Sequence, residues 1–195
     1  MMINLRNVVR GLKFLLKERK SKHNTHGSDE FYAPIERPYT DEVLHVNSEA
    51  IPAKAYKGNL NIKNVIIGKD VKTIGAEAFS GCFYIESIVV EPENPRFADY
   101  NSNAIIDKES GILLVGCRTT VIPECVTGIG PFAFCGQIFL KKLTIPSSVK
   151  KIDAYAFDGC GNLEELALQG GMVPLGEHAF RLCDKLKTIH SQKSL

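Results

Sequence analysis

Aromatic residues recur along this chain at a fixed interval. Each follows an alanine, in the pairs Ala55-Tyr56, Ala78-Phe79, Ala133-Phe134, Ala156-Phe157 and Ala179-Phe180. Consecutive aromatics lie 23, 55, 23 and 23 residues apart, so the long interval equals one 23-residue unit plus 32 further residues. Self-similarity at a fixed period of this kind predicts a repeat architecture, in which stacked units bury one continuous core.

The aliphatic residues recur at fixed positions relative to the aromatics. One stands five positions before each aromatic, and most units have three more at +6, +9 and +11. This L-x-x-L-x-L spacing points the apolar side chains of a short strand toward one core and the intervening residues outward. In the long interval, the frame predicts a sixth strand with the inward residues Cys117, Thr120 and Ile122.

Together these patterns predict a β-rich leucine-rich-repeat solenoid of about six stacked repeats with parallel strands, over residues 42–195. Residues 1–20 are predicted to form a basic amphipathic N-terminal helix, and residues 21–41 a linker that contains Pro34 and Pro38.

Several segments resemble the BspA-type leucine-rich-repeat family. IGAEAFSGC at 74–82 and LTIPSSVKKI at 143–152 look like its repeat signature. Residues 94–106, 111–114 and 120–123 are similar to its inserted β-hairpin repeat, which implies a hairpin insertion near residues 94–116. Many members are surface proteins that bind host or neighbouring-cell proteins, and many have no assigned role. The resemblance, over roughly residues 42–191, therefore implies a protein partner and, by family analogy only, the cell surface.

The N-terminal segment has apolar residues at helical spacing, with basic residues largely filling the gaps. These apolar residues are Leu5, Val8, Val9, Leu12, Leu15 and Leu16. Because a solenoid end exposes its core and needs a cap, one interpretation is a helix laid over the first repeat. A partner helix or dimer contact fits the same pattern, and so does a helix that binds anionic membranes.

Charge is unevenly distributed along the chain. Residues 1–22 hold seven basic residues and one acidic residue, whereas the remainder holds 17 basic and 21 acidic residues. A mildly acidic body argues against nucleic acid as the main ligand, because phosphate binding needs a concentrated basic face. The sequence contains neither an apolar run long enough to span a membrane nor the uninterrupted apolar core of a secretory signal. A cytoplasmic location is therefore expected for the sequence as it stands.

Six cysteines raise the question of disulfides or metal ligation. Cys82, Cys160 and Cys183 all stand three residues after an aromatic, Cys135 stands at +1, and Cys117 is at a strand position. No C-x-x-C pair occurs. Repeat equivalence favours structural thiols over a disulfide or a metal site, because a buried free cysteine packs as a small hydrophobe. We therefore expect neither a metal nor another cofactor.

The remaining chemistry-bearing residues do not form a recognisable constellation. His23 and His26 have a spacing that can chelate a metal, but a solvated linker is the preferred interpretation. Glu164 and Glu165 are adjacent on one predicted strand and so point to opposite sides. No G-x-S-x-G motif or phosphate-binding glycine loop occurs, so no catalytic residues are predicted and the protein is expected not to be an enzyme.

Outward residues of successive strands should form ladders, since neighbouring strands lie about 4.8 Å apart. The ladders at +8 and +10 combine branched apolar with polar side chains. They contain Asn64, Ile66, Ser87, Val89, Thr119, Val121, Lys142, Thr144, Glu165 and Ala167. One interpretation is a solvated face. The other is a partner-binding strip, in a non-enzymatic scaffold that holds a protein partner. A membrane-surface accessory protein docked through residues 1–20 is the alternative function, and the C-terminal edge is a candidate oligomer contact.

Overall fold

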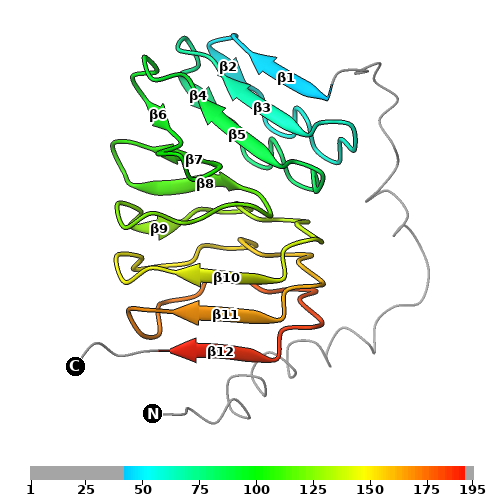
Figure 1. Ribbon diagram of the computed structural model, residues 1–195, viewed down its shortest axis with the longest axis vertical. Coiled ribbons are helices and arrows are strands. Elements are labelled where there is room, and N and C mark those ends of the chain that lie inside the picture. Colours follow the sequence, from blue (N-terminus) through cyan, green and yellow to red (C-terminus); the bar gives the residue numbers. More distant parts are fainter. Residues whose placement is uncertain (1–41, 192–195) are drawn as a thin grey trace. The chain divides into compact units, whose positions relative to one another are not determined.

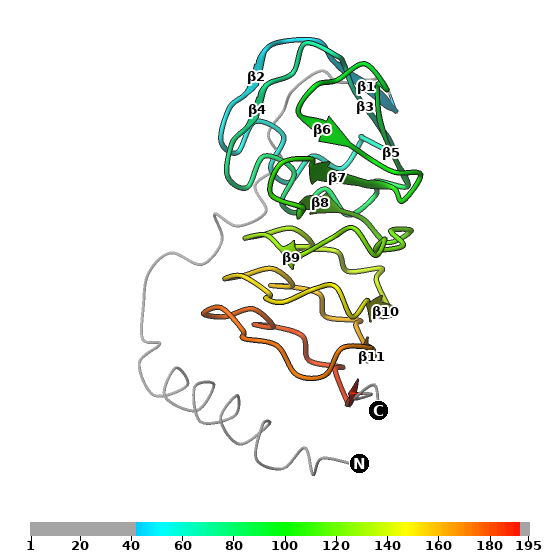
Figure 2. The ribbon, with the colours of Figure 1, turned by 90° about the vertical axis from the view of Figure 1, so that its left-hand side faces the viewer.

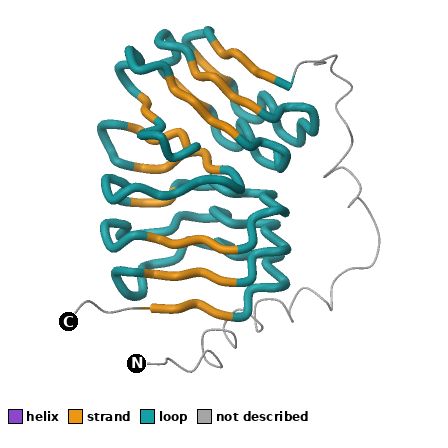
Figure 3. Tube along the Cα trace, viewed as in Figure 1, coloured by secondary structure: helices purple, strands orange, loops and turns teal. Residues whose placement is uncertain are grey.

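A computed structural model describes residues 42–191, in which short strands and turns repeat and stack on one another (Figure 1). The predicted N-terminal helix and linker, with their proposed membrane contact, lie outside the described residues. None of residues 42–191 is helical (Figure 3), so this region has no helix that could cross a membrane. The strands are β1 Val43–Val46, β2 Ala50–Ile51, β3 Asn64–Ile67, β4 Thr73–Ile74, β5 Ser87–Val90, β6 Phe97–Ala98, β7 Ala104–Asp107, β8 Ile112–Gly116, β9 Gly128–Ile129, β10 Lys142–Ile145, β11 Glu165–Leu168 and β12 Thr188–Ser191.

Six strands of four residues each form one side of the solenoid, here called the long-strand face, as two parallel sheets. β1, β3 and β5 make the first sheet, and β10, β11 and β12 make the second. Equivalent positions are in register, so Val65 pairs with Ile88 and Leu143 with Leu166, all of them buried. Residues of one row therefore share one face, and the parallel leucine-rich-repeat solenoid predicted from the spacing is confirmed.

The Ala-aromatic pairs form five stacked turns, numbered here 1 to 5 after Tyr56, Phe79, Phe134, Phe157 and Phe180. Each aromatic ring packs on the next within two separate stacks. Tyr56 and Phe79 form the first, at 5.2 Å between ring centroids. Phe134, Phe157 and Phe180 form the second, at 5.0 and 5.1 Å. The regular spacing of the aromatics predicts that Phe79, Phe134, Phe157 and Phe180 lie in a single column, and this prediction is wrong because Phe79 does not stack on Phe134.

The inserted hairpin separates the two aromatic stacks. β7 lies between β6 and β8 (Figure 2), and both of its faces are buried because Ile105 packs into one core and Ala104 and Ile106 into the other. Ile105 and Val115 pack into the core with turns 1 and 2, whereas Ile106 and Leu113 pack into the core with turns 3 to 5. Gly116 of β8 lies directly on the Phe134 ring, since an added Cβ atom would be 2.2 Å from it. The hairpin is thus a partition between two hydrophobic cores.

The sixth strand predicted at Cys117–Ile122 does not form. Cys117, Thr120 and Ile122 are buried as their spacing predicts, but the segment belongs to no sheet, and β1 is the sixth strand of the long-strand face. The loop that connects β6 to β7 explains this. The carboxylate of Asp99 accepts a hydrogen bond from the Val90 N–H at 2.7 Å, so a side chain satisfies part of the edge of β5. The direction of each side chain was predictable, but the backbone pairing was not.

The turns depend on left-handed backbone conformations at two positions. Two residues before each aromatic, φ lies between 56° and 60° at Lys54, Glu77, Phe132, Tyr155 and His178. Two residues after the aromatic, glycines with φ of 70° to 76° occupy turns 1 to 4, and Leu182 adopts φ 58° in turn 5. These glycines lie over one another, and Gly81 N–H donates to the Cys135 carbonyl at 2.9 Å. Turns 2 and 3 are therefore in contact on this side, although the insertion separates them in sequence.

Candidate functional site

The predicted partner-binding strip lies on the long-strand face but is interrupted at its centre. Asn64 pairs with Ser87 and Ile66 with Val89 in the first sheet, and Lys142 pairs with Glu165 and Thr144 with Ala167 in the second. Thr119 and Val121 lie between the two sheets, in the segment that forms no strand. The ten residues therefore form two short ladders with a seam between them, rather than one continuous strip.

Apolar exposure in the strip is concentrated at the seam. Val89 is 45% exposed and Val121 is 73% exposed, the highest value among the large apolar residues of the described region. A groove of about 370 Å³ runs beside Val121, and Lys142, Thr144 and Gln169 line it. The groove exists because the segment with Val121 does not pair with β10. The seam is therefore the part of the strip best shaped to accept a partner.

The outward residues seven positions after each aromatic form a charged row at +7, and contacts within the chain explain the part of this row on the first sheet and the seam. Glu42, Lys63, Glu86 and Arg118 alternate in sign along the row, and Lys63 pairs with Glu42 and Arg118 with Glu86. In the strip itself, Lys142 pairs with Glu165 at 2.9 Å. Exposed pairs of this kind contribute little stability, but they prevent repulsion between stacked like charges. These charges support the interpretation of a solvated ladder for the +7 row.

An exposed aromatic cluster borders the seam and was not predicted from the sequence. The rings of Phe83, Tyr84 and Phe139 lie 4.9 to 6.0 Å apart, and the Arg118 guanidinium lies 5.5 Å from the centre of the Phe139 ring. Tyr84 and Phe139 are each 39% exposed. Aromatic residues and arginine are enriched where proteins bind one another.

The repeats themselves show that the fold does not require this cluster. The positions of Phe83-Tyr84 are taken by Gly161-Asn162 in turn 4 and by Asp184-Lys185 in turn 5. The backbone makes the same turns at all of these places. A comparison of +4 and +5 across the repeats would have identified the cluster, because its residues depart from the pattern instead of following it.

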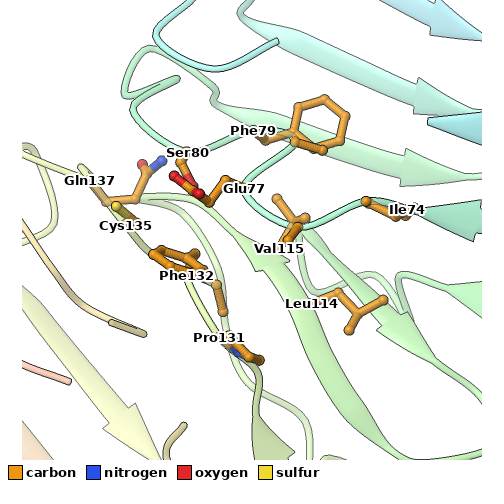
Figure 4. Close-up of a pocket in the computed structure, with 14 residues that line it drawn as sticks. Ile74, Glu77, Phe79, Ser80, Leu114, Val115, Pro131, Phe132, Cys135 and Gln137 are labelled. Carbon is orange, nitrogen blue, oxygen red and sulfur yellow. The ribbon is translucent and has the colours of Figure 1, made fainter. Parts of the chain in front are cut away.

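A second cavity, of about 250 Å³, lies between turns 2 and 3 (Figure 4). Ile74, Leu114, Val115 and Pro131 form an apolar end, and Glu77, Ser80, Cys135 and Gln137 gather at the other end. The cavity forms because β9 pairs with β8 of the hairpin, where a regular stack would pair it with β4. The inserted strand keeps turns 2 and 3 apart on the side of the solenoid that carries β4 and β9. On the other side, the contact of Gly81 with turn 3 closes the gap.

The cysteines at +3 have a structural role in the turns. The thiols of Cys82, Cys160 and Cys183 donate to the carbonyls of Tyr56, Phe134 and Phe157, each on the preceding turn, at 2.9 to 3.1 Å. Burial raises the pKa of the Cys82 thiol to about 12, and burial with the neighbouring Cys183 thiol raises that of Cys160. All six cysteines are free thiols, and Cys125 alone is exposed. Protonated, buried thiols are poor nucleophiles and poor metal ligands.

Residues 42–191 contain no group of three or more histidines, cysteines or acids that could hold a metal ion. His45 and His178 lie in different repeats, and His178 pairs with its neighbour Glu177 at 3.0 Å. His23 and His26 lie outside the described residues. Within the described region, the features suited to recognition are thus the seam, the aromatic cluster and the cavity between turns 2 and 3.

Solved structures with the same fold are known from several bacteria. A leucine-rich repeat protein from Eubacterium ventriosum is 26% identical over 66% of this chain, with a TM-score of 0.57. The pneumococcal vaccine antigen PcpA is 21% identical over 77% of the chain, with a TM-score of 0.52. The matched parts make up 36% and 42% of those proteins, so the chain spans less than half the length of either. A comparison with curated protein sequences gave no match.

The repeat pattern also matches a family profile directly. The profile of the BspA type leucine rich repeat region matches residues 43–104 and 116–195 in six copies. The residues between these matches, 105–115, include most of the β7–β8 hairpin that divides the core. With the register of the strands and the stacked Ala-aromatic turns, this match shows that the chain belongs to the BspA-type leucine-rich repeat family.

Proposed function

We propose that this chain is a non-enzymatic protein-binding scaffold whose partner contacts the long-strand face at the seam between its two sheets. The observation that supports this most directly is the exposure of Val89 and Val121 beside a groove. The equivalent position is Thr144 in β10 and Ala167 in β11, so large apolar side chains are not needed for the strand to form. Apolar side chains that gather at one exposed place mark a candidate contact surface.

The area at the seam alone is too small for stable binding. Burying one branched aliphatic side chain contributes ~1.5–3 kcal/mol, whereas association costs at least ~4 kcal/mol in lost freedom of motion. The aromatic cluster can supply the difference, because Thr119 of the strip directly follows Arg118, which stacks on Phe139. We therefore propose that Tyr84 and Phe139 extend the same contact surface.

The experiment compares partner capture by the full chain and by variants, with an extract of the native source. Val89→Asp combined with Val121→Asp should abolish capture of a specific protein and leave the thermal midpoint nearly unchanged, because both side chains are exposed. Met172→Asp is the matched control, since Met172 is 47% exposed but lies outside the long-strand face. A folded double variant that captures the same protein as fully as the control would refute the proposal.

A further inference from the structure

Backbone hydrogen bonds link successive turns in a regular set of three, which we call rungs. They start two residues before the aromatic, at the aromatic, and two residues after it. From turn 1 to turn 2 the rungs are Lys54 N–H to Ala76 at 3.0 Å, Tyr56 N–H to Ala78 at 2.9 Å and Gly58 N–H to Ser80 at 2.8 Å. All three recur from turn 3 to turn 4 and from turn 4 to turn 5, at 2.7 to 3.3 Å.

Only one of the three rungs forms between turns 2 and 3. Gly81 N–H donates to Cys135, but Glu77 N–H and Phe79 N–H have no hydrogen bond within residues 42–191. The Ala133 carbonyl, which would accept from Phe79, accepts from Gly116 of β8 instead, at 2.8 Å. Because φ of Glu77 is 58°, close to that of its four equivalents, these two N–H groups keep the orientation of the regular turns. Both therefore point toward the cavity between turns 2 and 3.

The cavity also contains polar side chains that are buried without a matching partner. Gln137 is 2% exposed, and its Nε2 donates to the Cys82 carbonyl at 3.4 Å, which leaves Oε1 without a donor. Ser80 is 4% exposed, and its hydroxyl has no oxygen or nitrogen partner and contacts only the sulfur of Cys135. Groups buried in this way are costly unless something completes their hydrogen bonds. The cavity thus offers two N–H donors, one amide acceptor and a hydroxyl.

The other surfaces of the cavity restrict the kind of molecule that fits. Glu77 pairs with Lys57 at 2.5 Å and with Lys54 at 3.6 Å, so its carboxylate is already neutralised and does not call for a cationic ligand. Ile74, Leu114, Val115 and Pro131 form an apolar wall. A volume of about 250 Å³ is below the ~300–1,000 Å³ of sites for drug-sized ligands, and it suits a group of the size of one amino-acid residue.

We propose that this cavity binds one residue of an extended peptide segment of a partner protein, with an aliphatic side chain on the apolar wall. Donors on residues two apart, here Glu77 and Phe79, match the spacing at which an extended chain presents its carbonyls on one side. The segment completes the two missing rungs, and one of its N–H groups donates to Gln137 Oε1. The site is separate from the seam and does not depend on the function proposed there.

The direct test is an NMR titration of the ¹⁵N-labelled full chain with N-acetyl-alanyl-leucine methylamide, whose acetyl and leucine carbonyls are two positions apart and so lie on one side of an extended chain. We expect saturable shifts of the Glu77 and Phe79 amide signals and of the Gln137 side-chain amide. Val89→Asp with Val121→Asp should leave these shifts unchanged, which separates this site from the seam. The absence of saturable shifts at Glu77 and Phe79 would overturn the proposal.

Matched variants decide whether binding occurs in the cavity itself. Ala76→Phe should narrow its mouth and weaken binding at least tenfold. Its control is Ala154→Phe, the same change at the equivalent place in turn 4, where all three rungs form. Larger residues already stand at this position in Pro131 and Glu177, so the fold accepts them. Equal binding by the two variants would overturn the proposal.

Gln137→Met provides a second measure that does not depend on the behaviour of Ala76→Phe. Methionine keeps the length of the side chain but removes the acceptor, so binding of the probe should weaken several-fold. An analogue of the probe with an ester in place of its second amide should bind Gln137→Met and the unaltered chain equally. If Gln137→Met binds the amide probe as tightly as the unaltered chain does, the cavity is an apolar pocket that does not recognise peptide.

Discussion

Gly136 lies so close to Gly81 that a Cβ atom on Gly136 would stand 2.7 Å from the Cα atom of Gly81. The two residues belong to turns 2 and 3, which are separated by the whole insertion. Both have left-handed backbones, with φ of 76° and 75°. The closest approach between neighbouring glycines of the turns is thus at the place where the sequence is least regular.

Gly136→Ala should therefore destabilise the protein more than Gly58→Ala. At Gly58 nothing lies within 4 Å of an added Cβ atom, so only the left-handed conformation costs free energy, about 1–2 kcal/mol. At Gly136 the clash with backbone adds to this, and overpacking typically costs ~1–3 kcal/mol more. Urea unfolding of both variants measures the difference. Equal losses would show that turns 2 and 3 are not held together at this point.

Phe157→Ala should lower the free energy of unfolding by ~3–5 kcal/mol, the usual loss for a core phenylalanine. Its ring is fully buried and packs against Phe134 on one side and Phe180 on the other. Phe180→Ala should cost less, because Phe180 has a stacked ring on only one side within the described residues. Urea unfolding monitored by circular dichroism is sufficient. A loss below about 1 kcal/mol for Phe157→Ala would mean that the aromatic register is wrong.

Leu182→Gly should stabilise the protein by up to ~1 kcal/mol, because leucine in a left-handed conformation carries a cost that glycine does not. Leu182 has φ 58° at the position where the other four turns have glycine, and its side chain is exposed. Leu60→Gly is the control, since Leu60 is also exposed but does not have a positive φ. The control should be destabilised. A lower thermal midpoint for Leu182→Gly would count against the conformation assigned to turn 5.

The buried thiols predict a loss of stability in alkali. In the folded protein the pKa of Cys82 is about 12 and that of Cys135 about 11, both raised chiefly by burial, from an ordinary value of 9.0. Between pH 9 and these values the unfolded chain loses the proton and the folded chain keeps it. Unfolding then becomes easier by about 1.4 kcal/mol per thiol for each pH unit.

Chemical denaturation between pH 8 and 11 measures this slope, and Cys82→Ala should reduce it because one such thiol is removed. An unchanged slope would mean that Cys82 is not protected in the folded state. Thiol titration in the same series should count six free thiols in denaturant without reductant. In the native protein Cys125 should react first, because it is the exposed one.

Spacing in the sequence predicted most of the inward side chains, but not all of them, since Leu175, five positions before Phe180, is 40% exposed. Cys117, Thr120 and Ile122 are buried at the places that the frame assigned to them. It did not predict that Asp99 would satisfy part of the edge of β5, because apolar periodicity contains no information about which polar group completes a backbone hydrogen bond. The aromatic column failed for a related reason, since nothing in the frame indicated that β8 would insert between Phe79 and Phe134.

The candidate site was less accessible to the same reasoning. Alignment of the repeats identifies residues at equivalent positions, so it identified the strip that contains Val89 and Val121. The role of this strip in binding stays a prediction. It overlooked Tyr84 and Phe139, which are exceptions to their rows. It also overlooked the cavity, whose polar groups at Glu77, Ser80 and Gln137 converge only because the hairpin separates two turns that would otherwise stack.

The insertion has a mechanical consequence for any partner of the long-strand face. The hairpin thickens the stack on one side, while the contact of Gly81 with turn 3 keeps the opposite side at its usual thickness. This unequal thickness turns the axis of the superhelix at the hairpin. As a result, β1, β3 and β5 run obliquely to β10, β11 and β12 (Figure 1). A rigid, straight ligand cannot lie flush along both halves at once. A single ligand that contacts both halves must itself bend by the angle that the β7–β8 hairpin introduces between them.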